Sequence, residues 1–101
     1  MRNVFFGLAS NYDTGSIPTV ALNRSGTVLE VHKSETTFGL YYHVGQLDRM
    51  TVTWGPSRHY DDGNEPRCAL NASNTAVEVH KSQVRGALFY HVGKVSGDAV
   101  E

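Results

Sequence analysis

The chain has 101 residues, of which 40% are hydrophobic and 19% charged, and its net charge is -1. This balance is typical of one small globular domain rather than of a disordered chain. Because there is no general excess of basic residues to neutralise phosphates, nucleic acid and anionic membranes are not expected as partners. The single cysteine, Cys68, cannot form an intrachain disulfide and is expected to be a small apolar strand residue.

The first residues, "MRNVFFGLASNYD", contain an apolar patch that is too short for a secretory signal peptide. No stretch approaches the ~20 apolar residues that a membrane-spanning helix needs. We therefore expect no membrane insertion and no export signal, which leaves a cytoplasmic location or release by another route. The sequons "NRS" at Asn23 and "NAS" at Asn71 are expected to be turns.

The predicted elements are all strands. Residues 18–23, 27–34, 39–46 and 50–54 alternate or run apolar and are rich in valine and aromatic residues. The sequence "NRSG" predicts a tight turn between the first two strands. The segment "GPSRHYDDGNEP" (55–66) is expected to be an irregular connection, because its glycine and proline residues interrupt regular structure.

The same pattern then occurs a second time. A shift of 48 residues aligns residues 12–45 with residues 60–93 without a gap, and 19 of the 34 aligned positions are identical. The pentapeptide "EVHKS" recurs unchanged at 30–34 and 78–82, and "VTWG" at 52–55 aligns with "VFFG" at 4–7. The chain is therefore expected to contain two copies of one four-stranded unit.

A repeated four-stranded unit of ~40 to 50 residues is typical of a β-propeller blade. We expect an all-β propeller fold with two blades per chain, at residues 8–55 and 56–101, and an outer strand at residues 1–7 that is donated to a neighbouring blade. Val100 would compete with Val4 for the place that Val52 holds, and the sequence leaves this open. The alternative is a β-sandwich of seven or eight strands, which gives no reason for the repeat.

Two blades cannot close a ring, and repeat units need at least ~three neighbours to be stable. Propellers have roughly four to eight blades, so identical two-bladed chains could close as dimers, trimers or tetramers. A trimer with six blades is favoured.

The motifs "YDxG", "ALN", "EVHKS", "YHVG" and "WG" together resemble a tandem repeat of bacterial β-propellers, and the resemblance covers nearly the whole chain. The two-bladed layout is also similar to small bacterial fucose-binding lectins that trimerise. This resemblance implies a multivalent lectin whose partners are glycans or simple sugars and further copies of itself. Those lectins bind sugar with a tryptophan and an arginine–glutamate pair, whereas this chain has one tryptophan and no arginine that recurs at equivalent positions.

Polar residues of the repeat permit two interpretations. On a strand Glu30, His32 and Ser34 share one face, and a buried carboxylate or imidazole without a partner is costly. The recurrence of Glu30, His32 and His43 as Glu78, His80 and His91 therefore predicts a hydrogen-bonded network within or between blades, which Asp13 and Asp61 could anchor. Alternatively, the same residues contact a ligand once per blade.

A sugar site needs an aromatic face together with fixed polar groups. Such groups recur in both units, so carbohydrate sites are expected at grooves between blades. The candidate ligand-binding residues are Tyr12, Asp13, His32, Lys33 and Tyr41 in the first unit and Tyr60, Asp61, His80, Lys81 and Phe89 in the second.

Catalysis and cofactors are not expected, because no nucleophile elbow, phosphate-binding loop or metalloprotease motif is present in the sequence. A metal site on His32 and His43 would require the two side chains to share a face, which depends on the register of the hairpin. The alternative function is a structural or protein-interaction scaffold, including a fragment of a longer tandem propeller.

Overall fold

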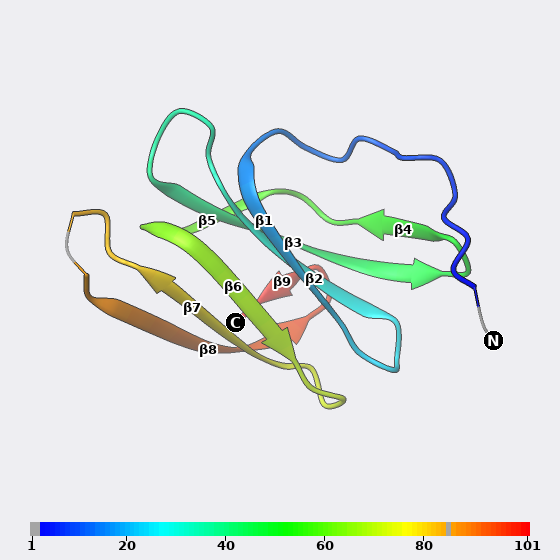
Figure 1. Ribbon diagram of the computed structural model, residues 1–101. Helices are drawn as coiled ribbons and strands as arrows, with labels where there is room; N and C mark the ends of the chain where they lie inside the picture. Colours follow the sequence, from blue (N-terminus) through cyan, green and yellow to red (C-terminus); the bar gives the residue numbers. More distant parts are fainter. Residues whose placement is uncertain (1–2, 85) are drawn as a thin grey trace.

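The patterned segments form two antiparallel sheets in the computed structural model, which describes residues 3–84 and 86–101. In each sheet four strands form a meander in which they follow one another in space as they do in the chain (Figure 1). The described residues contain no helix that is long and apolar enough to cross a membrane. The first sheet contains β1 (Ser16–Leu22), β2 (Thr27–Lys33), β3 (Gly39–Asp48) and β4 (Thr51–Trp54), and the second contains β6 (Asn64–Leu70), β7 (Thr75–Lys81), β8 (Leu88–Ser96) and β9 (Ala99–Val100).

The two meanders have the same register. Glu30 lies opposite His43 in the first sheet, and Glu78 lies opposite His91 in the second. The structure confirms the prediction of an all-β chain in which each unit contains a four-stranded meander.

The predicted tight turn is also present. The side-chain oxygen of Asn23 accepts hydrogen bonds from the backbone N–H groups of Ser25 and Thr27, and Asn71 does the same in the second unit. Both asparagines of the sequons therefore act as turn residues, as expected.

The expectation that residues 55–66 are irregular was wrong. Residues Arg58–Asp62 form strand β5, which pairs with the beginning of β3, where Leu40 lies opposite Asp61. Strand β4 covers only Gly45–Asp48 of β3, so the other half of that edge is free to accept β5. The glycine and proline residues confine the strand to the five residues between them, and they do not prevent it. The first sheet thus extends past the expected unit boundary at residue 55.

Within one chain, Val100 occupies the outer place of the second sheet. Val100 pairs with Val95 as Val52 pairs with Leu47, and Glu101 exchanges two backbone hydrogen bonds with Lys94. Residues 3–15 form no strand within this chain, and β9 lies at the outer edge of the second sheet. The donation of residues 4–7 to a neighbouring chain stays a prediction. Residues 1 and 2 of that predicted strand lie outside the described residues.

The core lies between the two sheets, where β6 packs alongside β1 and β2 (Figure 1). Full burial of one such aliphatic or aromatic side chain stabilises a fold by roughly 1.5–3 kcal/mol. Polar contacts join the same surfaces, since the Thr19 hydroxyl donates to the Pro66 carbonyl at 3.0 Å and the Asn23 amide donates to the Asn71 carbonyl at 2.9 Å. The core consists of Leu29, Val31, Tyr42 and Val44 of the first sheet and Ala76 and Val95 of the second, with Tyr60, Cys68, Leu70 and Val100 packed against it.

Cys68 provides a test of this packing. Its sulfur lies 3.5 Å from the Leu29 carbonyl oxygen, and burial, together with the nearby Glu30 and Glu78 carboxylates, raises the pKa of the thiol to about 12. Because the thiolate is the reactive form, modification by an aromatic disulfide reagent at pH 8 should be about a hundredfold or more slower in the native protein than in guanidinium chloride. Equal rates in the two solutions would show that the sheets are not packed around this residue.

Candidate functional site

The first polar cluster consists of Tyr12, Asp13, Glu30, His32 and His43. Alternation along β2 and the pairing of Glu30 with His43 put the two β2 side chains and the β3 histidine on one face of the sheet. The Tyr12 hydroxyl donates to a Glu30 carboxylate oxygen at 2.7 Å, and His32 Nδ1 lies 2.9 Å from the other Glu30 oxygen. Asp13 Oδ2 lies 2.8 Å from His43 Nε2 and 3.4 Å from His32 Nε2.

The second polar cluster repeats this arrangement with Tyr60, Asp61, Glu78, His80 and His91. The Tyr60 hydroxyl donates to Glu78 at 2.5 Å, and His80 Nδ1 lies 3.0 Å from the same carboxylate. Asp61 Oδ2 lies 2.7 Å from His91 Nε2 and 3.5 Å from His80 Nε2. Tyr60 and Asp61 belong to β5 of the first sheet, whereas their partners are on β7 and β8 of the second. The predicted network is therefore present, and in this unit it joins two sheets.

Hydrogen bonding fixes the charge state of the groups at the ends of each cluster. Burial, followed by the hydrogen bond to Glu30, raises the pKa of Tyr12 well above its ordinary value, and the same causes act on Tyr60 through Glu78. Partial burial is the largest single influence on the pKa of Asp13 and raises it, but the hydrogen bonds with His43 and the Thr14 N–H, together with the nearby His32, outweigh it and the net shift is downward. The pKa of Asp61 is lowered in the same way through His91. Both tyrosines are therefore neutral donors and both aspartates are anions at neutral pH.

The two clusters differ in how well they are covered. The His43 side chain is only 5% exposed, and its Nδ1 donates to the Gly55 carbonyl oxygen at 2.9 Å. The His91 side chain is 48% exposed. Trp54 also stacks on Tyr12, with ring centroids 5.0 Å apart.

The structure brings together most of the residues that the sequence predicted as ligand contacts. In the first unit Tyr41 stacks on His32 with ring centroids 5.9 Å apart, and in the second Phe89 lies 5.8 Å from His80. The lysines are the exception. Lys33 neighbours His32 on β2, so it points to the other face, where its ammonium lies 5.2 Å from the Phe38 ring centroid. Lys81 follows His80 on β7 and is placed on the opposite face for the same reason.

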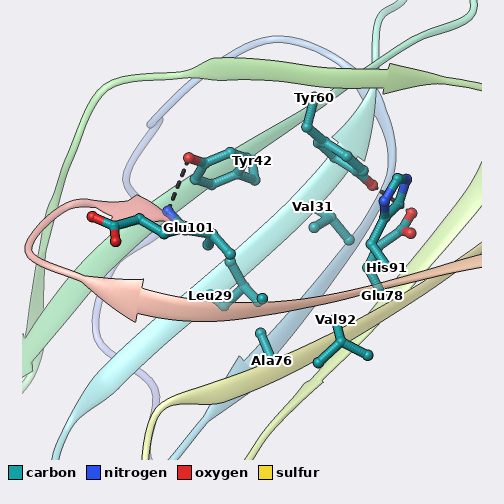
Figure 2. Close-up of a pocket in the computed structure, with 11 residues that line it drawn as sticks. Leu29, Val31, Tyr42, Tyr60, Ala76, Glu78, His91, Val92 and Glu101 are labelled. Carbon is teal, nitrogen blue, oxygen red and sulfur yellow. Dashed lines mark hydrogen bonds between the residues drawn. The ribbon is translucent and has the colours of Figure 1, made fainter.

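A polar groove of about 240 Å³ opens over the first cluster. It is lined by hydroxyl, carboxylate and imidazole groups beside one aromatic ring, which is the combination expected for a hydroxyl-rich ligand. A separate cavity of about 200 Å³ lies between the two sheets and is mostly apolar, and of the predicted ligand residues only Tyr60 lines it (Figure 2). The Val100 N–H donates to the Tyr42 hydroxyl at the edge of this cavity. The polar groove is lined by Asp13, Thr14, His32, Ser34, Glu35, Thr36, Tyr41 and Ser57.

Sequence reasoning did not include His43 and His91 among the ligand-binding residues, although both were candidates for the network. Their recurrence within "YHVG" was a usable signal, but the face on which they lie depends on the hairpin register, which only the structure supplies. The Gly55 carbonyl, which fixes the His43 ring, has no side-chain signal at all.

Comparison of the chain with family models, curated proteins and solved structures gives no match. The functional conclusion below consequently depends on the site and on the repeat.

The glycine of each "YDxG" motif allows the chain to pass close to the histidine ring. A Cβ on Gly63 would lie 2.6 Å from His80 Cδ2 and 2.8 Å from the Lys81 carbonyl oxygen, and this backbone atom cannot easily move away. We expect Gly63→Ala to lower the free energy of unfolding by roughly 1–3 kcal/mol in chemical denaturation. The matched control is Gly86→Ala, which meets no atom within 4 Å and should change stability by less than about 0.5 kcal/mol. Equal stability of the two variants would contradict this packing.

Proposed function

We propose that the chain is a non-catalytic, multivalent carbohydrate-binding protein whose two sheets are blades of a β-propeller closed by further copies of the chain. The observation that carries the carbohydrate proposal is the polar groove over the first cluster. Its Ser34, Thr36 and Ser57 side chains carry hydroxyl groups, Glu35 adds a carboxylate, and the Tyr41 ring offers a flat apolar surface. A sugar presents the complementary pair of surfaces, hydroxyl groups and an apolar C–H face.

Multivalency follows from the repeat. Such a shallow site buries little apolar area, so a single site would bind weakly. The second unit has the same cluster with Phe89 in place of Tyr41, and several sites on one rigid ring would raise the overall avidity by as much as ~10² to 10⁴.

The case for ring closure is that one sheet face is buried in the first unit and exposed in the second. The first sheet packs its inner residues against the second sheet, whereas the same positions 48 residues later are 40% or more exposed. Exposed contiguous apolar surface of this kind marks an interaction site. The exposed fractions are 3% for Leu29, 2% for Val31, 8% for Tyr42 and 4% for Val44, against 40% for Val77, 45% for Val79, 69% for Tyr90 and 61% for Val92.

On the opposite sheet face, residues of the second unit are packed and their counterparts in the first unit are exposed. Tyr60, Cys68 and Leu70 of the second unit pack against the core, whereas their counterparts Tyr12, Val20 and Leu22 are 40%, 61% and 55% exposed. The exposed face of the second sheet therefore fits the exposed face of the first sheet in another copy. Such a head-to-tail contact generates a closed ring when its rotation closes.

A strand edge supports the same assembly. In the first sheet β5 pairs with the beginning of β3, whereas the corresponding part of β8, Leu88–Tyr90, pairs with β7 on one edge and has no strand on its other edge among the described residues. The segment 48 residues before β5 is Ser10–Thr14, which forms no strand in this chain. We propose that residues 10–14 of one copy pair with β8 of the preceding copy, which removes an exposed edge. The segment donated is then residues 10–14 rather than the outer-strand residues 4–7.

We expect a closed oligomer in solution, most simply a trimer of about 33 kDa, three times the chain mass of 11.1 kDa. The double variant Tyr90→Glu with Val92→Glu should be monomeric by light scattering, because it buries charge in the proposed contact. Both side chains are exposed in the chain itself, so its circular dichroism should not change. The control Val84→Glu, at an 88% exposed loop position, should keep the oligomer. A monomeric parent protein at micromolar concentration would refute the ring.

For the carbohydrate site, we expect binding on a glycan array that a free monosaccharide competes away. Replacing Tyr41 and Phe89 together by alanine should weaken binding by about tenfold or more, since each site loses its aromatic surface. The control is Phe38→Ala, an exposed aromatic on the opposite side of β2 that should leave binding unchanged. Silence across a broad array from an intact ring would instead favour the scaffold function.

A further inference from the structure

Three potential metal ligands converge in each polar cluster. In the first, Asp13 Oδ2, His32 Nε2 and His43 Nε2 lie within 4.8 Å of one another, with separations of 2.8 Å and 3.4 Å from the carboxylate oxygen to the two nitrogens. Ligand atoms about 2.0–2.2 Å from one ion lie about 2.8–3.6 Å apart in octahedral to tetrahedral geometry. Both carboxylate–nitrogen separations fall within that range, and the two nitrogens lie within 4.8 Å of each other. The atoms are therefore spaced as ligands around a common centre.

Hydrogen bonds to the other ring nitrogens direct the lone pairs toward that centre. A carbonyl oxygen cannot donate, so the contact with Gly55 requires the proton of His43 on Nδ1. His32 Nδ1 lies 2.9 Å and 3.0 Å from the two oxygens of Glu30, which accepts from Tyr12 as well. In the neutral imidazoles both Nε2 atoms are then acceptors. This is the carboxylate- or carbonyl-supported orientation of histidines that bind metal ions.

As a result, the Nε2 acceptors of the two neutral histidines face the Asp13 carboxylate oxygen, which is also an acceptor. His43 Nε2 faces Asp13 Oδ2 at 2.8 Å, and both atoms present lone pairs when the ring is neutral. A positive centre between them removes the repulsion, and either an extra proton on each ring or one bound cation can supply it. A divalent cation satisfies all three atoms at once.

The second cluster brings together the same three kinds of ligand atom, with His91 more exposed than His43. Asp61 Oδ2 lies 2.7 Å from His91 Nε2 and 3.5 Å from His80 Nε2, and Glu78 holds His80 Nδ1 at 3.0 Å. Each cluster supplies three protein ligands, which leaves at least one coordination position for water or another ligand. In the first cluster Asp13 and His32 line the polar groove, so an ion has a path of entry from solvent.

We propose that Asp13, His32 and His43, and equally Asp61, His80 and His91, each bind one divalent first-row transition-metal ion, with zinc as the reference ion. Two imidazoles and one carboxylate suit zinc and its neighbours in the series better than magnesium or calcium, which prefer oxygen ligands. This site does not depend on carbohydrate binding, and the sequence pattern alone did not favour it.

The test is titration of the purified, chelator-treated chain with zinc against a chromophoric chelator, together with cobalt as a spectroscopic probe. We expect two zinc ions per chain, a higher melting temperature in zinc, and a visible cobalt absorption band stronger than that of the aqueous ion. His43→Ala should reduce the count from two to one. Asp13→Asn, which keeps the side-chain shape, should weaken the first site by more than about tenfold, because even an indirect supporting group affects affinity by about 10- to 100-fold.

The control is His59→Ala, which removes an exposed histidine that also faces a carboxylate, Asp62 at 2.9 Å, but belongs to neither cluster. It should still bind two ions. Fewer than one zinc per chain in the parent protein would overturn the proposal and leave the proton-bridged network as the explanation. The same count in His43→Ala as in His59→Ala, with Asp13→Asn unchanged in affinity, would overturn it as well.

Discussion

The rest of the structure depends on one constraint, the placement of carboxylates and imidazoles on a buried sheet face. Glu30 and His32 on β2, like Glu78 and His80 on β7, are each less than 7% exposed. Removing such groups from water without partners would cost several kcal/mol, so the chain must supply them. It does so with a tyrosine and an aspartate from the segment that precedes each unit, and in the second unit this segment is strand β5 of the other sheet.

The buried polar groups of the second unit therefore find their hydrogen-bond partners only when the two sheets pack together. Strand β5 pairs along the edge of β3, while its Tyr60 and Asp61 side chains bond to β7 and β8, so packing of the two sheets and completion of the second cluster occur together. Tyr12 and Asp13 make the same bonds to the first sheet, but no sheet edge in this chain pairs with them. A segment that is bonded on one side and unpaired on the other is suited to joining a second copy, and the apolar faces exposed on the two units have the complementary relation.

The two proposals use the clusters in different ways. For carbohydrate, the buried network would hold the groove rigid, and groove side chains outside the network, including Ser34, Thr36 and Tyr41, would contact the ligand. For a metal ion, the network itself would contain the ligands, and Glu30 and the Gly55 carbonyl would orient the rings. The proposals are compatible, because the ion would lie beneath the groove and the sugar within it.

The sequence by itself determined the strands, the repeat and the chemistry that recurs. Alternating apolar residues with the "NRSG" and "NASN" turns specify meanders, because side-chain period and turn geometry are local properties. It also indicated a polar network, since identical charged residues at a spacing of 48 imply identical surroundings.

The tertiary structure decided the features that depend on strand register and on which segment pairs with a free strand edge. Only strand pairing places Glu30 opposite His43 and so brings both histidines and Asp13 together, and a shift of one residue would have put them on opposite faces. Strand β5 was missed because its pairing partner, the free half of the β3 edge, is distant in sequence. Within one chain, Val100 pairs with Val95 at the outer edge of the second sheet, a pairing that the similar patterns around Val4 and Val100 could not predict.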